Sequence, residues 1–226
     1  MSARRNTSNE GATKQKIIDA ALVLFAEYGI DGVPVRALTS HAGVNVAAIH
    51  YHFGGMEAVA EAVFSELSAR INKTRTSKLE DILARAKAKR KKPDVADIVL
   101  VFVEPYLDEN ATTEGQLLAQ LILKHRLSPS PMTEQVIKQH FDPMAKQFVA
   151  ALHAAVPSVP LSQMYWRYML LVSAVVLSVS NRSASNRLER LSGGEADGSD
   201  LNALRNALIE FVIGGIRAPH HAVPAP

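Results

Sequence analysis

Apolar residues recur at steps of three and four along almost the whole chain, which is the spacing of amphipathic helices. The alternation at every second residue that marks a half-buried strand is absent, and no segment repeats another. Segments rich in proline, such as SPSP at 128–131 and PSVP at 157–160, separate the helical patterns. The sequence therefore predicts an all-α protein. Its helices are expected over about 13–28, 34–42, 46–52, 55–78, 95–107, 112–127, 133–156, 161–181 and 201–216.

Residues 34–53, PVRALTSHAGVNVAAIHYHF, contain two short helical patterns separated by a glycine. Pro34 suits the first position of a helix, where no backbone N–H is needed. Gly43 can take a positive φ and so end that helix, and Asn45 is a good N-cap for the second. Two short helices around such a turn are typical of a helix-turn-helix, which places its second helix in the major groove of DNA.

The second of these helices has two different faces. Ile49 and Phe53 lie four residues apart and are expected to point inward. Small side chains at the start of a helix allow its backbone to come close to base edges in the groove. The side chains left facing outward are Val46, Ala47, His50 and Tyr51.

A longer stretch, from about residue 13 to residue 67, resembles the DNA-binding domain of the TetR family of bacterial transcriptional regulators. The resemblance is carried by IIDAALVLFAEYGIDG, VRALTSHAGV and IHYHFGGMEAVAEAV. It implies an N-terminal three-helix DNA-binding domain joined by a long helix to a helical domain that binds an effector and dimerises. One departure concerns the Ser-Lys pair that usually follows Phe-Gly, which is Gly55-Met56 here. A lysine that commonly contacts phosphate is therefore missing.

The resemblance and the composition together predict four segments. We expect a disordered arm over 1–12, the helix-turn-helix domain over 13–58, the effector and dimerisation domain over 59–218 and a flexible tail over 219–226. The DNA-contacting residues that this division implies lie on the two short helices. They are Arg36, Thr39, Asn45, Val46, Ala47, Ala48, His50, Tyr51 and His52.

The second domain is rich in large apolar side chains, which favours a pocket for a small apolar effector. The phrase GVNVAAIHYHFG, followed downstream by YWR, is similar to regulators that respond to fatty acids or acyl thioesters. A carboxylate on such an effector would meet Arg126 or Arg167. Candidate ligand contacts, although residues of these types are more often plain core, are Phe102, Tyr106, Leu118, Leu121, Ile122, His125, Phe148, Trp166, Met169 and Leu170.

The segment 165–179 is apolar nearly all round, and such a helix needs cover on every side. Pairing of 161–182 and 201–217 with the same helices of a second copy would give a two-fold homodimer interface. Tyr165 and Trp166 either anchor this contact or fill the core of one protomer. A dimer would bind a near-palindromic operator on double-stranded DNA, most simply as a repressor that the effector releases.

Other chemistry finds little support in the 226 residues. There is no cysteine, no glycine-rich phosphate loop after a strand and no HExxH, so we expect neither an enzyme nor a cofactor. His41, His50 and His52 do not share one helix face, so no metal site is expected. The net charge of +3 permits DNA binding without arguing for it. No signal segment or membrane span is recognised, and a soluble cytoplasmic protein is expected.

A second interpretation stays open. The chain could be an all-helical binder of a small molecule or protein partner that does not bind specific DNA. The methionine at position 56, where a phosphate-contacting lysine is common, favours this alternative.

Overall fold

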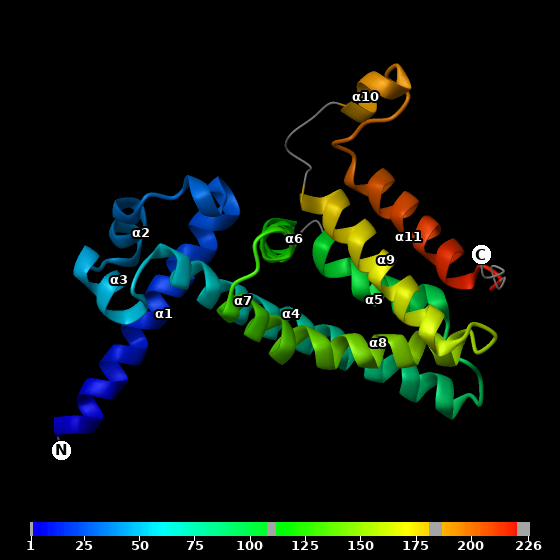
Figure 1. Cartoon of the computed structure of the whole chain (residues 1–226), viewed down its shortest axis with the longest axis horizontal. Coiled ribbons are helices and arrows are strands. Elements are labelled where there is room, and N and C mark those ends of the chain that lie inside the picture. The colour runs from blue at the N-terminus through cyan, green and yellow to red at the C-terminus, as the bar shows by residue number, and fades with distance from the viewer. Residues whose placement is uncertain (1, 108–111, 181–186, 221–226) are drawn as a thin grey trace, which may run out of the picture.

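The computed structural model describes residues 2–107, 112–180 and 187–220, and this part of the chain is helical without any strand. The predicted all-α fold is confirmed. A small N-terminal group of helices stands at one end of an elongated molecule, and a larger helical body forms the rest (Figure 1). The N-terminal elements are α1 (Ser2–Tyr28), the short helix η1 (Ile30–Gly32), α2 (Val35–Ala42) and α3 (Val46–Phe53).

Helix α1 begins earlier than expected. It starts at Ser2, so the prediction of a disordered arm is wrong for residues 2–12. This segment is polar, and polarity indicates exposure to solvent but does not distinguish coil from a solvated helix. Most polar residues differ from alanine by only a few tenths of a kcal/mol, up to about 0.7, in helix propensity. A helix already anchored by the buried residues Ile17 and Ala21 can therefore extend outward.

Helix α4 (Met56–Ala88) joins the two parts of the molecule. Its 33 residues correspond to about 50 Å at 1.5 Å per residue, longer than the predicted 55–78. The row Val59, Val63, Leu67 and Ile71 is buried as its spacing indicates. The same spacing continues to Leu79, which is also buried, so the inner face extends into residues 73–92, a stretch rich in lysine and arginine.

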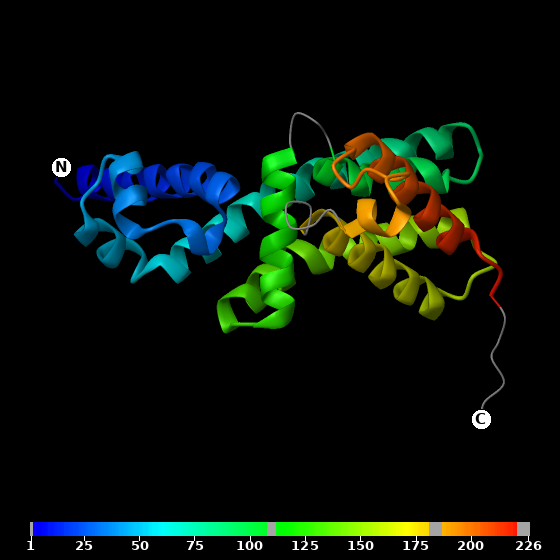
Figure 2. The same ribbon diagram turned by 90° about the horizontal axis from the view of Figure 1, so that it is seen from above.

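The body is built around α4, and Figures 1 and 2 show α8 running beside it and α6 crossing it. Helix α9 packs against α5, α6, α8 and α11. The remaining elements are α5 (Val95–Leu107), α6 (Thr112–Leu127), α7 (Pro131–Val136), the π-helical turn η2 (Ile137–Phe141), α8 (Asp142–Ala155), α9 (Leu161–Ser180), α10 (Arg187–Ser192) and α11 (Leu201–Arg217).

The helix expected over 133–156, with Pro143 as the point of a kink, is divided in the structure. The chain forms α7, the π turn η2 and then α8, with Pro143 in the first turn of α8. Proline lacks the N–H that a continuous helix would need, and the wider turn before it removes that conflict. Helix α10 was not expected, because none of its six residues is buried and it therefore shows no inner face.

Gly115 marks a close approach between α5 and α6. A Cβ atom at this position would clash with the Pro105 carbonyl oxygen and would lie 2.7 Å from Tyr106 Cα. We expect Gly115→Ala to lower the free energy of unfolding by about 1–3 kcal/mol, because both obstacles are backbone. Urea denaturation measures this loss. Gly11→Ala on α1, which meets nothing within 4 Å, is the control and should not destabilise; equal stability of the two variants would contradict the close approach.

Candidate functional site

The turn between α2 and α3 has the geometry that its residues predict. Gly43 takes the left-handed conformation at φ 65°, and the Asn45 side chain accepts a hydrogen bond from the Ala48 N–H at 2.9 Å. Pro34 lies one position earlier than expected, as the N-cap of α2. Ile49 is buried, and Phe53 is half-buried against the same core. Local capping therefore fixes where α3 begins and which face it buries.

The outward row of α3 is confirmed. Val46, Ala47, His50 and Tyr51 are exposed, and Tyr51 keeps 75% of its surface accessible. Figure 1 places α3 at the outer edge of the N-terminal domain, away from the body.

The remaining candidates for DNA contact differ in how far they are exposed to solvent. Arg36 and Asn45 are exposed, and Ala48 and His52 are half-buried beside the core of the domain. Thr39 is buried, and its hydroxyl donates to the Arg36 carbonyl oxygen at 3.1 Å, so its expected role in backbone contact is contradicted. A threonine can satisfy its hydroxyl within its own helix and then pack as an apolar residue.

Tyr51 makes a contact that the sequence did not indicate. Its hydroxyl donates to a Glu10 carboxylate oxygen at 3.0 Å, which ties α3 to the early part of α1. This hydrogen bond and the negative charge of Glu10 raise the pKa of the Tyr51 phenol. The phenol is therefore a neutral donor, and an approaching phosphate would compete with Glu10 for it.

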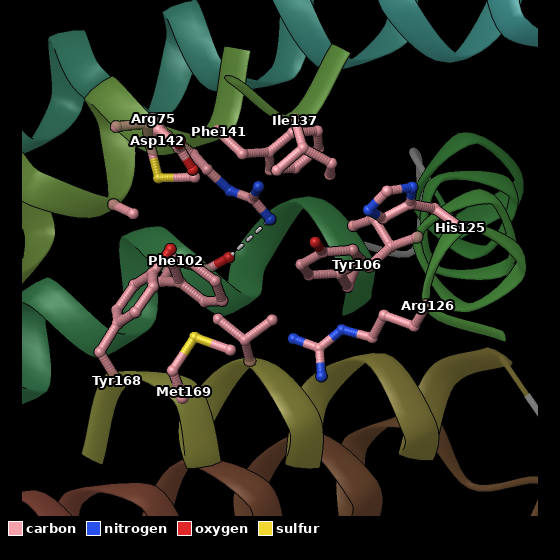
Figure 3. A pocket seen from close by; sticks show the side chains of 14 residues that line it. Arg75, Phe102, Tyr106, His125, Arg126, Ile137, Phe141, Asp142, Tyr168 and Met169 are labelled. Carbon is pink, nitrogen blue, oxygen red and sulfur yellow. Dashed lines mark hydrogen bonds between the residues drawn. The ribbon is translucent and has the colours of Figure 1, made fainter. Parts of the chain in front are cut away.

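A cavity of about 360 Å³ lies in the body between α4, α5, α6, η2, α8 and α9 (Figure 3). Its wall is mainly aliphatic and aromatic, with a few polar groups, which is usual for small-molecule sites. The residues that line it are Arg75, Phe102, Tyr106, Ile122, His125, Arg126, Ile137, Phe141, Asp142, Met144, Ala145, Tyr168, Met169 and Val172.

Half of the ligand candidates lie on this wall, namely Phe102, Tyr106, Ile122, His125 and Met169. The others lie elsewhere. Those buried in the core behind the cavity are Leu118, Leu121 and Phe148, and those exposed on the outer face of α9 are Trp166 and Leu170. Arg126 lines the cavity as expected for a carboxylate partner. Arg167 instead donates to the Ile216 and Ala218 carbonyl oxygens at 2.7 and 2.8 Å.

Arg75 and Tyr168 are lining residues that the sequence analysis missed. Arg75 follows Leu67 and Ile71 at steps of four, so its spacing did place it on the inner face of α4. Arg75 also belongs to the lysine- and arginine-rich stretch 73–92, which indicated exposure to solvent instead. Tyr168 is buried on α9, and burial raises the pKa of its phenol, which therefore stays neutral.

His125 connects the cavity wall to the first part of α4. Its Nδ1 lies 2.8 Å from the Thr133 hydroxyl, and Thr133 and Ser130 form the capping box that begins α7. The Ser130 hydroxyl donates to a carboxylate oxygen of the nearly buried Glu61 at 2.7 Å. Glu61 lies close to the start of α4, so a continuous polar chain runs from the cavity toward the N-terminal domain.

The outer face of α9 and α11 is apolar and exposed. Leu170, Leu177 and Phe211 keep 67%, 61% and 74% of their surfaces accessible. Tyr165 and Trp166 are exposed as well, so the alternative in which they fill the core of one protomer is wrong. A Cβ added at Gly214 or Gly215 would meet nothing within 4 Å, which leaves room for close backbone approach there.

Two further features are absent from the part of the chain that the structure describes. No helix in that part is long and apolar enough to cross a membrane. Within the same ranges, no group of three His, Cys, Asp or Glu side chains is placed to hold a metal ion.

Comparison with known families gives two matches. Residues 17–63 match the family described as "Bacterial regulatory proteins, tetR family". Residues 101–215, more than half of the chain, match "Tetracyclin repressor-like, C-terminal domain".

Curated relatives match through the N-terminal domain. The chain is 41% identical over 63 residues to the probable HTH-type transcriptional regulator YttP of Bacillus subtilis, and 35% identical over 63 residues to the HTH-type transcriptional regulator SrpR of Pseudomonas putida. Each match covers 28% of this chain and 30% of the relative, so the chain spans about 30% of the length of the curated relatives it matches. The printed names of both relatives describe transcriptional regulators.

Solved structures share the fold over nearly the full length. A transcriptional regulator from Rhodococcus sp. Rha1 aligns with a TM-score of 0.60 at 18% identity, covering 91% of this chain and 98% of the other. The fatty acid degradation regulator FadR from Bacillus halodurans aligns with a TM-score of 0.55 at 17% identity, covering 89% and 98%. At this identity the likeness shows the fold alone. The two family matches are the stronger finding, and by them the chain belongs to the tetR family of bacterial regulatory proteins.

Proposed function

We propose that this protein is a transcriptional regulator, most simply a repressor, that binds a near-palindromic operator as a homodimer and is released by a small effector. The observation that carries the proposal is the outward row of α3. Val46, Ala47 and His50 are small or polar, exposed and set at the edge of the molecule on a helix whose other face is buried. Such a helix fits the major groove of B-DNA.

Phosphate contacts supply most of the affinity in this account. Arg36 and Tyr51 are exposed beside the α3 turn, and Asn45 both caps α3 and faces solvent. Met56 is half-buried against the core, so its side chain serves packing where the family commonly has a phosphate-contacting lysine. The unpaired backbone N–H groups at the start of α4 remain as phosphate donors, as at other helix N-termini.

Dimerisation through α9 and α11 places two copies of α3 on one duplex. The exposed apolar face of these helices, with Leu170, Leu177 and Phe211, provides the contact. Two α3 helices about 34 Å apart would bind half-sites one helical turn apart. Because the two α3 helices are linked in one dimer, the affinity for the whole operator exceeds that for a single half-site without any new contact.

Release requires that an effector bind the cavity more tightly when the two α3 helices are wrongly spaced for DNA. A coupling of about 1–3 kcal/mol is typical of such linkage. The polar chain from His125 to Glu61 gives one route from the cavity to α4. An exposed ion pair of 3.1 Å between Lys124 on α6 and Asp31 on η1 gives another contact between the two domains.

The effector is small and mostly apolar, and fatty acids and acyl thioesters are the candidates. The cavity of about 360 Å³ lies near the lower end of the usual range for ligand sites, roughly 300–1,000 Å³. It therefore suits a short acyl chain.

Binding to DNA at varied salt tests the proposal against the alternative of a binder that does not contact DNA, which the loss of lysine at position 56 favours. We expect the protein to retain a subset of genomic fragments, including DNA upstream of its own gene. Affinity should fall by about 1,000-fold or more between 50 and 200 mM salt, because several phosphates are neutralised. Binding that is absent, or equal for a shuffled sequence of the same composition, would contradict it.

A further inference from the structure

Arg75 is a fully buried cation in the wall of the cavity. It lies on the inner face of α4, and none of its surface is accessible to solvent. Figure 3 shows its guanidinium pointing toward the middle of the cavity. The Arg75 Cζ atom lies 4.7 Å from the centre of the Phe102 ring and 4.6 Å from that of Tyr106.

The hydrogen bonds of this guanidinium are incomplete. Nη1 donates to Asn72 Oδ1 at 3.0 Å and Nη2 donates to the Phe102 carbonyl oxygen at 2.9 Å. Nε has no hydrogen-bond partner within residues 2–107, 112–180 and 187–220, although a guanidinium carries five N–H donors. Among the described residues, the ion pairs all involve other side chains, so Arg75 has no carboxylate within 4.0 Å.

A buried cation without a counter-ion is costly, and the two aromatic rings offset only part of that cost. Packing alone does not require the charge, because a methionine has a similar stem and would fill the same space. An anion that entered the cavity would offset the rest of this cost.

The other charged groups around the cavity favour an anion as well. Arg126 also points into it (Figure 3), while its Nη1 donates to the Ser173 hydroxyl at 3.3 Å. Asp142 is the carboxylate on the described wall, and it is exposed and lies beyond ion-pair distance of Arg75. Two guanidinium groups thus face a single carboxylate.

We propose that the effector is a small amphiphilic carboxylate whose headgroup pairs with Arg75 and whose hydrocarbon part packs against Phe141, Met144 and Met169. The inference rests on the proposed function, in which the cavity holds the effector. It selects the free acid over the thioester, since a thioester carbonyl is neutral at the position where Arg75 needs a negative charge.

The test compares acids with neutral isosteres. Straight-chain carboxylates from butanoate to decanoate, and phenylacetate, are titrated into the full-length protein by calorimetry, each beside its primary amide. We expect at least one acid to bind about 10- to 100-fold more tightly than its amide, the range expected from one charge-assisted hydrogen bond. Equal binding of acid and amide, or no binding by any acid in the series, would overturn the inference.

Variants assign the preference to one side chain. Arg75→Met should abolish the discrimination between acid and amide. Arg85→Met, the same change at an exposed position of α4 outside the cavity wall, should leave acid binding within about two-fold of the wild type. Retention of the full acid preference in Arg75→Met would refute the role of Arg75. If circular dichroism shows that Arg75→Met does not fold, the ratio of acid to amide affinity is compared between Arg75→Lys and the wild type instead.

DNA binding is measured on the same samples without any carboxylate. A protein that binds an acid selectively but no DNA would refute the proposed regulator and leave this inference standing. A protein that binds operator DNA and shows no acid preference would refute this inference alone.

Discussion

Ala47→Glu is expected to abolish specific DNA binding while leaving the fold intact. Ala47 is exposed in the first turn of α3, where its small side chain allows the backbone to approach base edges. A carboxylate there would meet the phosphates of the groove and hold the helix away. Operator affinity should fall by about 100-fold or more, since a disrupted base contact costs about 1–3 kcal/mol and a dimer carries the change twice. Fluorescence anisotropy with labelled operator DNA measures the loss.

The matched control is Ala84→Glu. Ala84 is exposed on α4, so the change in charge and helix propensity is the same, but the position lies in the body of the molecule. This variant should bind the operator as the wild type does, within about two-fold for a surface substitution. If Ala84→Glu lost as much affinity as Ala47→Glu, net charge rather than α3 would be responsible.

Leu170→Glu is expected to convert the homodimer to a monomer. Leu170 lies at the exposed apolar face of α9 and α11, with 67% of its surface accessible in one protomer. Two buried carboxylates across a two-fold axis would lack any partner, which strongly disfavours association. Light scattering should show half the molecular mass, and operator affinity should fall by about 100-fold or more as the linkage of the two α3 helices is lost.

Leu127→Glu provides the comparison. Leu127 is 78% exposed at the end of α6 and is not part of the exposed face formed by α9 and α11. The Leu127→Glu variant should remain a dimer. A dimeric Leu170→Glu variant with normal operator affinity would show that some other face joins the protomers.

The surface of α3 could be predicted from sequence because short-range chemistry fixes it. Gly43 needs a positive φ and Asn45 caps with its own side chain, so both act within a few residues. Once these ends are set, the step of four between Ile49 and Phe53 decides which face is buried. Thr39 was expected to face the DNA backbone, but its hydroxyl donates to the Arg36 carbonyl oxygen instead. Residue type alone does not reveal this option.

The cavity could be predicted only in part, because its wall depends on how separate helices pack. Leu118 and Ile122 lie one turn apart on the same stripe of α6, yet only Ile122 lines the cavity. Trp166 and Met169 likewise share α9 and face different ways. Periodicity separates inner from outer residues but does not distinguish a filled core from a hollow one.

Arg75 shows the opposite failure. Its spacing after Leu67 and Ile71 indicated the inner face, and its charge argued for solvent. The spacing predicted the buried position of Arg75 correctly. Charged residues are rarely buried without a reason such as a partner or ligand.

The central claim is that two copies of α3, joined by a symmetric body, bind one face of a duplex. Sequencing the genomic DNA fragments that the purified protein retains tests it most directly. The account predicts a shared inverted repeat whose half-site centres are about 10 base pairs, or a multiple of that, apart. A single undivided half-site, or retained fragments with no common motif, would contradict it.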